Sequence, residues 1–294
     1  MSDKTYEKLD ARGLIAVEGP DAKPFLQGLV SNDVNKVAPG RAVYAAFLTA
    51  QGKYLHDFFV AQHGDALLID CEAARLADFK KRLSLYKLRS KVTIAEKGAD
   101  VGVYALMGAG AAEAANLANE PGAAGALGDG VAFVDPRLAD AGARAILPVA
   151  EADALLSAKG FAKADTGTYD RLRLSLGLPD GSRDLEVEKS ILLENGFDEL
   201  NGIDWDKGCY MGQELTARTK YRGLIKKRLV PVEIEGPVPP AGTPIMLDGS
   251  EVGEMRSGAG GLGLALIRLE HMDKAPFNVG DARVTPRKPR WAAF

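Results

Sequence analysis

The feature that most constrains the fold is a change in the pattern of apolar and polar residues near residue 224. Beyond this point, short segments of alternating apolar and polar residues are separated by glycine and proline, which is typical of a small β-barrel. These segments are residues 229–234, 243–247, 251–257, 261–267 and 282–284. Before it, strand-like and helix-like segments alternate and the alternation repeats, which predicts two similar α+β units. We therefore expect an α+β protein with a separate C-terminal barrel.

Several segments of the first part predict individual elements. Residues 42–60 form two apolar runs around Gln51-Gly52-Lys53, which predicts a β-hairpin. A helical apolar pattern follows Asp21, which can cap the first amides of that helix. We also expect strands at 66–71, 101–107, 132–135 and 145–149, helices at 76–86 and 151–159, and helix in the alanine-rich stretch after Met107.

Length and composition limit the protein class. A chain of 294 residues is long enough for two or three domains. No apolar run approaches the ~18 residues that a membrane helix needs, so we expect no membrane association. The first residues, MSDKTYEKLDARG, show neither an apolar signal core nor a transit pattern, and we expect a cytosolic protein.

Cysteine and histidine are too sparse to predict a metal site. Cys71 and Cys209 lie far apart in the sequence and lack the paired spacing of zinc or cluster motifs. His56, His63 and His271 form no HxxxH or HExxH pattern. We expect no protein-bound metal.

The segment KGCYMGQELTARTKYRG, residues 207–223, presents a candidate reactive thiol. Two glycines bracket Cys209-Tyr210-Met211 and allow a sharp turn there. The nearby basic residues, Lys207 among them, favour thiolate over thiol. The alternative is that Cys209 is a small buried hydrophobe, as lone cysteines often are. Cys71 ends an apolar strand, and we interpret it as a core or strand-end thiol.

Two carboxylates allow alternative interpretations. Asp57 lies in an otherwise aromatic strand, where it either faces solvent or sits in a pocket with a shifted pKa. Glu194 follows three apolar residues and precedes Asn195-Gly196, so it either caps a turn or enters a cavity.

The net charge of −3 argues against general nucleic-acid binding, but the charge is uneven. Residues 80–91 contain six Lys or Arg and no acid, and residues 207–228 contain seven against the single Glu214. An RNA-binding module is a third-ranked possibility, because these stretches lack the interleaved aromatics of single-strand stacking surfaces. The segment GAGAAEA lacks the GxGxxG spacing, so we do not expect nucleotide binding there.

The octapeptide KGCYMGQE resembles the signature of the folate-binding YgfZ family, relatives of the glycine-cleavage T-protein that support iron–sulfur enzymes. The matching residues are Lys207, Gly208, Cys209, Tyr210, Gly212, Gln213 and Glu214. GIDWDKG upstream and Tyr221-Arg222-Gly223 downstream reinforce the match. The pattern GxDAxxFLQ followed by SNDV, near residues 19–34, also resembles the opening of both YgfZ proteins and T-proteins. Weaker matches extend the resemblance over almost the whole chain.

The resemblance implies a T-protein-like fold with two interleaved α+β domains and a small C-terminal β-barrel. The expected folate-binding domain is discontinuous, residues 1–45 with 100–225; residues 46–99 belong to the second α+β domain and 226–294 form the barrel. The implied function is support of iron–sulfur cluster assembly or repair. The expected cofactors are tetrahydrofolate, or a derivative, and a transient iron–sulfur cluster. The expected partners are reduced folate and iron–sulfur client or assembly proteins, and we expect a monomer.

By the same resemblance, Asp57 and Glu194 contact the pterin, and Arg89 or Arg222 pairs with the glutamyl carboxylates. Cys209 is the functional thiol at the edge of the cleft. The surroundings depart from the family pattern, since Leu192 and Leu193 replace a proline and a polar residue.

The alternative function is tetrahydrofolate-dependent aminomethyl transfer, as in T-proteins. The cysteine motif argues against it because T-proteins lack that motif. His56 also argues against it, since it takes the place of an acid next to Asp57. We therefore lean towards an assembly factor rather than a turnover enzyme.

Overall fold

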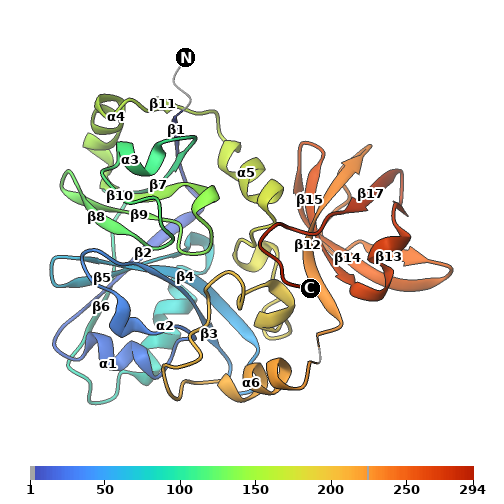
Figure 1. Cartoon of the computed structure of the whole chain (residues 1–294). Coiled ribbons are helices and arrows are strands. Elements are labelled where there is room, and N and C mark those ends of the chain that lie inside the picture. The colour runs from blue at the N-terminus through green and yellow to red at the C-terminus, as the bar shows by residue number, and fades with distance from the viewer. Residues whose placement is uncertain (1–3, 224) are drawn as a thin grey trace. The chain divides into compact units, whose positions relative to one another are not determined.

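The structure is a computed structural model that describes residues 4–223 and 225–294. The chain forms two compact units, each made of several segments (Figure 1). Unit 1 holds the residues up to 48, 55–169 and 200–211. Unit 2 holds residues 49–54, 170–199 and 212–294.

Unit 1 contains two sheets. The first has the strand order β11-β1-β7-β10-β9-β8, and the second has the order β3-β4-β5-β2-β6. Strand β1 pairs in parallel with β11 and antiparallel with β7. The first sheet contains β1 (Thr5–Lys8), β7 (Val101–Met107), β8 (Ala124–Leu127), β9 (Gly130–Val134), β10 (Ala143–Pro148) and β11 (Ala162–Lys163). The second contains β2 (Arg12–Glu18), β3 (Val43–Leu48), β4 (Tyr54–His63), β5 (Ala66–Glu72) and β6 (Thr93–Glu96).

The helices of unit 1 are short and cover the sheets. They are α1 (Ala22–Gln27), α2 (Leu76–Tyr86), α3 (Ala111–Ala114) and α4 (Val149–Ala158), with 3-10 turns η1 (Val34–Lys36), η2 (Ala73–Arg75) and η3 (Ala139–Ala141). Helix α2 buries Phe79 and Leu83 completely. The ring of Phe79 lies 4.8 Å from that of Phe58 on β4 and 5.8 Å from that of Phe47 on β3. This aromatic contact fixes α2 on the second sheet.

A buried ion network joins the two sheets of unit 1. Arg144 on β10 contacts Asp70 on β5 at 3.0 Å, and Arg12 on β2 contacts the same carboxylate at 2.6 Å. Arg137 pairs with Asp135 at 2.8 Å, and Arg144 lies 3.6 Å from Asp135. Burial alone would raise the pKa of Asp135, but Arg137 and Arg144 hold it below its usual value. Because a buried charge without its partner is costly, removing one member would destabilise this junction strongly.

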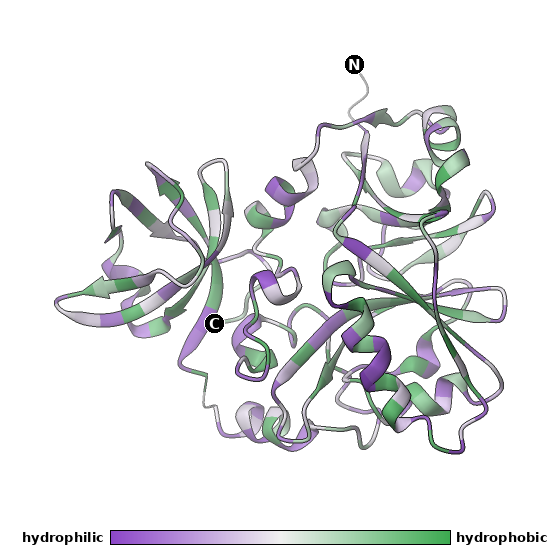
Figure 2. Cartoon of the chain, turned by 180° about the vertical axis from the view of Figure 1, so that it is seen from behind, coloured by the Kyte–Doolittle hydropathy of each residue, from purple (hydrophilic) through white to green (hydrophobic). Residues whose placement is uncertain are grey.

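Unit 2 contains the C-terminal β-barrel and the segments that lead to it. The barrel strands follow the order β13-β14-β15-β12-β17-β16 around an apolar core. Hydrophobic and hydrophilic segments alternate along these strands in Figure 2. They are β12 (Lys227–Glu235), β13 (Pro244–Leu247), β14 (Ser250–Ala259), β15 (Leu262–Arg268), β16 (Phe277–Val279) and β17 (Ala282–Pro286). The helical segments are α5 (Thr168–Leu176), which begins in unit 1, α6 (Gln213–Tyr221), η4 (Gly181–Arg183), η5 (Leu192–Asn195) and η6 (Leu269–Lys274). Within unit 2, Arg173 pairs with Asp184 at 2.7 Å and donates to Ser257 on β14 at 2.8 Å.

The structure confirms the α+β class, the C-terminal barrel and most of the predicted elements. The predicted hairpin is β3 with β4, and the predicted helices at 76–86 and 151–159 are α2 and α4. Two expectations were wrong. The Asp21 side chain does not cap α1, because its carboxylate accepts the amide of Lys91 at 2.7 Å. The alanine-rich stretch is helical only over α3, because Asn116 just after it has a φ of +61° and turns the chain away from the helix.

The exact domain boundaries stay a prediction. Within the described residues, no helix is long and apolar enough to cross a membrane.

Candidate functional site

Residues 207–212, which we call the cysteine loop, turn sharply at both ends. Gly208 has a φ of +86° and Gly212 has a φ of +81°, and both values are in the left-handed region that favours glycine. Gly212 directly precedes α6. Between them, Cys209 is exposed, whereas Tyr210 is buried. The loop therefore exposes the Cys209 thiol to solvent, while the buried Tyr210 side chain next to it holds the loop in place.

Lys207 anchors the loop in unit 1. Its ammonium group donates to the carbonyl oxygens of Val30 at 2.5 Å and Asn32 at 2.7 Å. The same nitrogen lies 5.2 Å from the ring centre of Tyr210. Burial lowers the pKa of Lys207 to about 8. These contacts assign Lys207 an anchoring role that the sequence did not predict.

The end of α1 holds the loop at two further points. The side-chain amide of Gln27 donates to the carbonyl of Lys207 at 3.4 Å. The main-chain amide of Met211 donates to the carbonyl of Gly28 at 3.0 Å. The loop is thus fixed before and after Cys209.

Ser31 and Asn32 form the base of the site, and neither was predicted as a site residue. The Asn32 amide donates to the carbonyls of Tyr44 and Asn201, both at 2.7 Å. The Ser31 hydroxyl donates to the carbonyl of Gly202 at 2.6 Å. Their contacts join the segment before the cysteine loop to β3. The signal that could have found them is the SNDV pattern, which we used only as a family resemblance.

Asp57 is buried, which excludes the solvent-facing interpretation of this carboxylate. It is 4% exposed and accepts a hydrogen bond from the Tyr44 hydroxyl at 2.9 Å. Burial, and then the Asp57 charge, raise the pKa of Tyr44 well above its usual value. Arg137 lies over the Tyr44 ring, 5.2 Å from its centre. Tyr44 is therefore a neutral donor held between Asp57 and Arg137.

Tyr44 also lines a groove of about 640 Å³ in unit 1. Its other lining groups include Asn32, Asp204 and Trp205, and it extends to Asp206, three residues before Cys209. The volume lies in the range of small-molecule sites, and the half-buried Trp205 ring offers flat apolar surface beside polar groups. The groove thus adjoins the buried Asp57–Tyr44 pair at Tyr44 and the residue before the cysteine loop at Asp206.

His56 does not share the surroundings of Asp57, and our argument from this residue was wrong. Successive residues of a strand point to opposite faces. His56 therefore faces α2, where its Nε2 lies 3.0 Å from Asp78 and its ring stacks on Phe79 at 4.5 Å. Burial lowers the pKa of His56 to about 3, so the ring is neutral. His56 gives no reason to exclude aminomethyl transfer.

The other predicted site residues are divided between the units. Arg89 is exposed in unit 1, on the turn after α2. Four others belong to unit 2: Glu194, Arg222, Gln213 and Glu214.

Glu194 lies in η5 and is half-buried. Its carboxylate forms no hydrogen bond or ion pair among the described residues, and burial raises its pKa. Arg222 is exposed directly after α6, and Glu214 pairs with Arg218 within that helix. Neither unit brings all the predicted folate contacts together.

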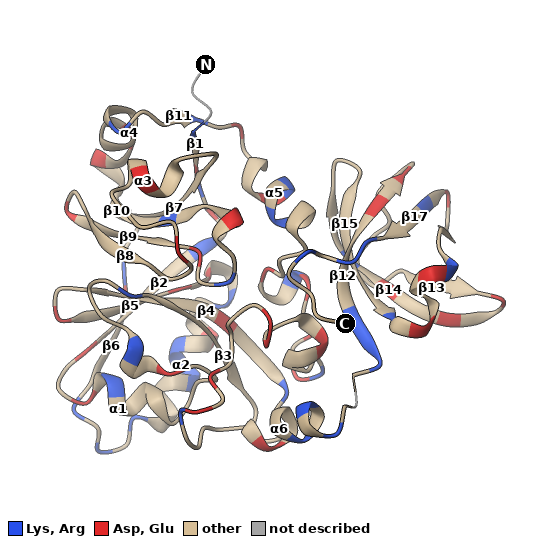
Figure 3. Ribbon diagram, viewed as in Figure 1, with Lys and Arg blue, Asp and Glu red and all other residues tan. Residues whose placement is uncertain are grey.

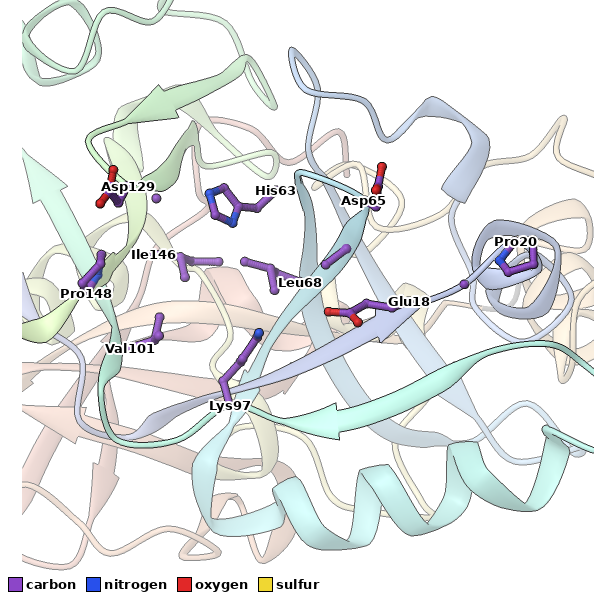
Figure 4. Close-up of a pocket in the computed structure, with 13 residues that line it drawn as sticks. Glu18, Pro20, His63, Asp65, Leu68, Lys97, Val101, Asp129, Ile146 and Pro148 are labelled. Atoms are coloured by element: carbon purple, nitrogen blue, oxygen red, sulfur yellow. The ribbon is translucent and has the colours of Figure 1, made fainter.

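A larger groove of about 820 Å³ lies elsewhere in unit 1 (Figure 4). Leu68 and Ile146 lie in its middle, and Glu18, Lys97, His63 and Asp129 surround them. It contains none of the predicted site residues. Among the described residues, no group of three His, Cys, Asp or Glu side chains is placed to hold a metal ion.

The chain is similar to proteins of known family over nearly its full length. Residues 9–120 match the GCVT N-terminal domain, and residues 226–294 match the CAF17 C-terminal β-barrel domain. The human iron–sulfur cluster assembly factor IBA57, mitochondrial, is 37% identical over 92% of this chain and 79% of the human protein. The mouse protein is 34% identical over 98% of this chain and 85% of its own length. The chain belongs to the IBA57 family.

The fold match supports the predicted architecture. The glycine-cleavage aminomethyltransferase T from Bartonella henselae superimposes with a TM-score of 0.78 over 99% of this chain and 87% of that protein, at 15% identity. The T-protein-like fold is therefore confirmed. The family is IBA57 rather than YgfZ, so the resemblance identified the fold and the broad class of proteins but not the family itself.

Our prediction of a cytosolic protein is contradicted by the relatives. The human, mouse and Neurospora crassa proteins are mitochondrial. The prediction was based on the composition of residues 1–13 alone.

The contrast between the two thiols gives a first prediction. In the folded protein, iodoacetamide should alkylate Cys209 and leave Cys71 unmodified, because Cys71 is 1% exposed and burial raises its pKa to about 12. Peptide mass spectrometry over time measures both rates, with denatured protein as the control in which both thiols react. Equal labelling of the two cysteines in the folded protein would contradict this assignment.

Proposed function

We propose that this protein supports the assembly of iron–sulfur clusters through the Cys209 thiol. The observation that carries the proposal is the cysteine loop, which exposes Cys209 while Lys207 and Met211 fix the chain on both sides. The named activity of the relatives supports the same function. A thiol held in this way meets a partner in one orientation, which lowers the entropy cost of that encounter.

Cys209 supplies a single thiolate, so a cluster would be shared with another protein. Iron–sulfur clusters are usually held by four ligands, most often cysteine thiolates. Cys71 cannot complete the set, because it is buried in β5. The cluster is therefore cargo that passes between proteins, and Cys209 is the contact that this chain offers to it.

We also propose that the protein binds a reduced folate in the groove beside Asp57 and Tyr44. The volume of about 640 Å³, the half-buried Trp205 ring and the neighbouring Asn32 and Asp204 suit a polar aromatic ring system. The buried Tyr44 hydroxyl donates to the buried Asp57 carboxylate, so this pair would support the wall against which the ring lies. When bound, the folate would supply one-carbon chemistry, and these residues would orient its ring.

The remaining predicted contacts are kept as parts of this proposal. A folate contact at Glu194 is supported by the raised pKa of this carboxyl group and by its lack of a hydrogen-bond or ion-pair partner among the described residues. Arg89 and Arg222 have exposed guanidinium groups that suit the solvent-facing carboxylates of a glutamyl tail. The contribution of each of these three residues to folate binding is tested by substituting it singly.

Aminomethyl transfer is the second candidate function. It is favoured by the fold match to aminomethyltransferase T and by the position of His56, which leaves the Asp57 face unchanged. Turnover with a purified lipoyl carrier protein and tetrahydrofolate would identify the protein as such an enzyme. We expect no turnover, and measurable turnover would replace the assembly function by this one.

The cellular role of the thiol is tested by complementation. In cells that lack the endogenous protein, Cys209→Ala should fail to restore the activity of a cluster-dependent enzyme such as aconitase. Cys71→Ala is the matched control and should restore it, because Cys71 is buried in β5. Immunoblots must show equal amounts of both variants. Full rescue by Cys209→Ala would overturn the proposed role of this thiol.

Folate binding is tested by titration calorimetry with tetrahydrofolate. Asp57→Asn should weaken binding by about 1–3 kcal/mol, because a buried hydrogen-bonding carboxylate is lost while the side-chain shape is kept. Asp65→Asn is the control, since Asp65 lines the larger groove instead. Absence of heat and of a thermal shift with the wild-type protein would remove folate from the proposal.

A further inference from the structure

Three large apolar side chains at the end of α2 are exposed, although the Tyr86 ring also meets the edge of the buried Phe47 ring at 6.1 Å. Leu85 is 68% exposed, Tyr86 is 44% exposed and Leu88 is 88% exposed. The buried face of the same helix is already formed by Phe79 and Leu83. Large apolar side chains that gather on one surface mark contact sites more often than isolated ones do.

The turn that carries Leu88 is fixed in an unfavourable conformation. The amide of Ser90 donates to the carbonyl of Lys87 at 2.8 Å, and Leu88 between them has a φ of +40°. A branched side chain rarely adopts a positive φ, and this one gains almost no packing in return. The end of the turn is held as well, because the main-chain amide of Lys91 donates to the Asp21 carboxylate at 2.7 Å. Strain of this kind is found at sites where a side chain is presented to a ligand.

The same surface is strongly basic. Residues 80–91 contain six Lys or Arg and no acid, and Figure 3 marks them in blue on and after α2. Lys80 pairs with Glu96, and Arg82 pairs with Asp78. The other four are exposed and, among the described residues, form no ion pair: Lys81, Lys87, Arg89 and Lys91. Since the whole chain has a net charge of −3, this positive charge is a local feature.

A hollow of about 640 Å³ lies beside the exposed leucine. It is lined by Asp21, Tyr86, Leu88, Arg89 and Ser90. An apolar side chain of a partner could enter it between the Tyr86 ring and Leu88. The depression is shallow and open to solvent, and a protein surface can present a side chain that matches it, whereas a lipid surface presents none.

We propose that residues 81–91, which we call the basic turn, dock a protein partner whose acidic surface surrounds an exposed apolar side chain. Unpaired lysines attract the acidic rim, and Leu85, Tyr86 and Leu88 form the apolar centre, which is the usual arrangement of a protein interface. The proposal goes beyond the function of Cys209 and does not depend on it. A nucleic acid is disfavoured because it offers no apolar partner for Leu85 and Leu88.

The test uses the full chain and a defined probe. The probe is a fluorescent amphipathic helical peptide with leucine and phenylalanine on one face and glutamate around it. Its control has every glutamate replaced by lysine. Fluorescence anisotropy should show saturable binding of the acidic peptide, weakened by salt, and no binding of the basic one.

Two variants separate a docking role from a structural one. Leu88→Gly removes the apolar contact and relieves the positive φ, so it should weaken peptide binding by about tenfold or more while the melting temperature stays the same or rises. Met246→Ala, at an exposed methionine of the barrel, is the matched control and should bind normally.

The charge of the basic turn is tested separately. Lys87→Glu with Lys91→Glu should also weaken binding by about tenfold, because charge attraction is replaced by repulsion. Lys226→Glu with Lys274→Glu makes the same charge change at exposed positions of unit 2 and should bind normally. Arg89 is left unchanged so that folate binding is not altered, and Cys209→Ala should bind the peptide as the wild type does.

Three results would overturn the proposal. The first is that the wild type fails to bind the acidic peptide. The second is that Leu88→Gly binds as tightly as the wild type. The third is that vesicles rich in phosphatidylserine or single-stranded RNA bind at the basic turn while the acidic peptide does not. Failure here leaves the role of Cys209 untouched, since that role is measured in cells with a different variant.

Discussion

The candidate site depends on one half-buried ammonium group, that of Lys207. Lys207 donates to the carbonyls of Val30 and Asn32, which lie in the segment after α1. A main-chain carbonyl accepts a hydrogen bond from a cation strongly in a partly buried place, which offsets the cost of burial that lowers the pKa of Lys207. Because Cys209 lies two residues further on, the position of the thiol follows from the position of this amine.

The rest of unit 1 provides the rigid surface to which that amine binds. The Arg144–Asp70 contact joins the two sheets, and the Tyr44–Asp57 pair lies near the end of β3 and the middle of β4. Asn32 connects the two regions, since its amide donates to the carbonyl of Tyr44 while its own carbonyl accepts from Lys207. The proposed folate groove and the cysteine loop therefore share a common base.

Sequence patterns predicted the fold well and the site only in part. Strands, helices and the barrel follow from local periodicity and turn residues, and the signature identified Cys209 and its glycines. Three features depend on tertiary contacts that no local pattern shows. The first is that His56 and Asp57 point to opposite faces, which required knowledge of which face packs on α2. The second is the anchoring by Lys207, whose partners lie about 175 residues earlier in the chain. The third is the base made by Ser31 and Asn32, which looked like an ordinary helix end.

The central claim is that Lys207 holds the cysteine loop, and hydrogen exchange at the Met211 amide tests it most directly. That amide donates to the Gly28 carbonyl on the far side of Cys209, so its protection reports whether the loop is fixed. In Lys207→Met, we predict that Met211 exchanges about tenfold faster or more, whereas the amides of β10 keep their protection. Unchanged protection of Met211 in that folded variant would contradict the account.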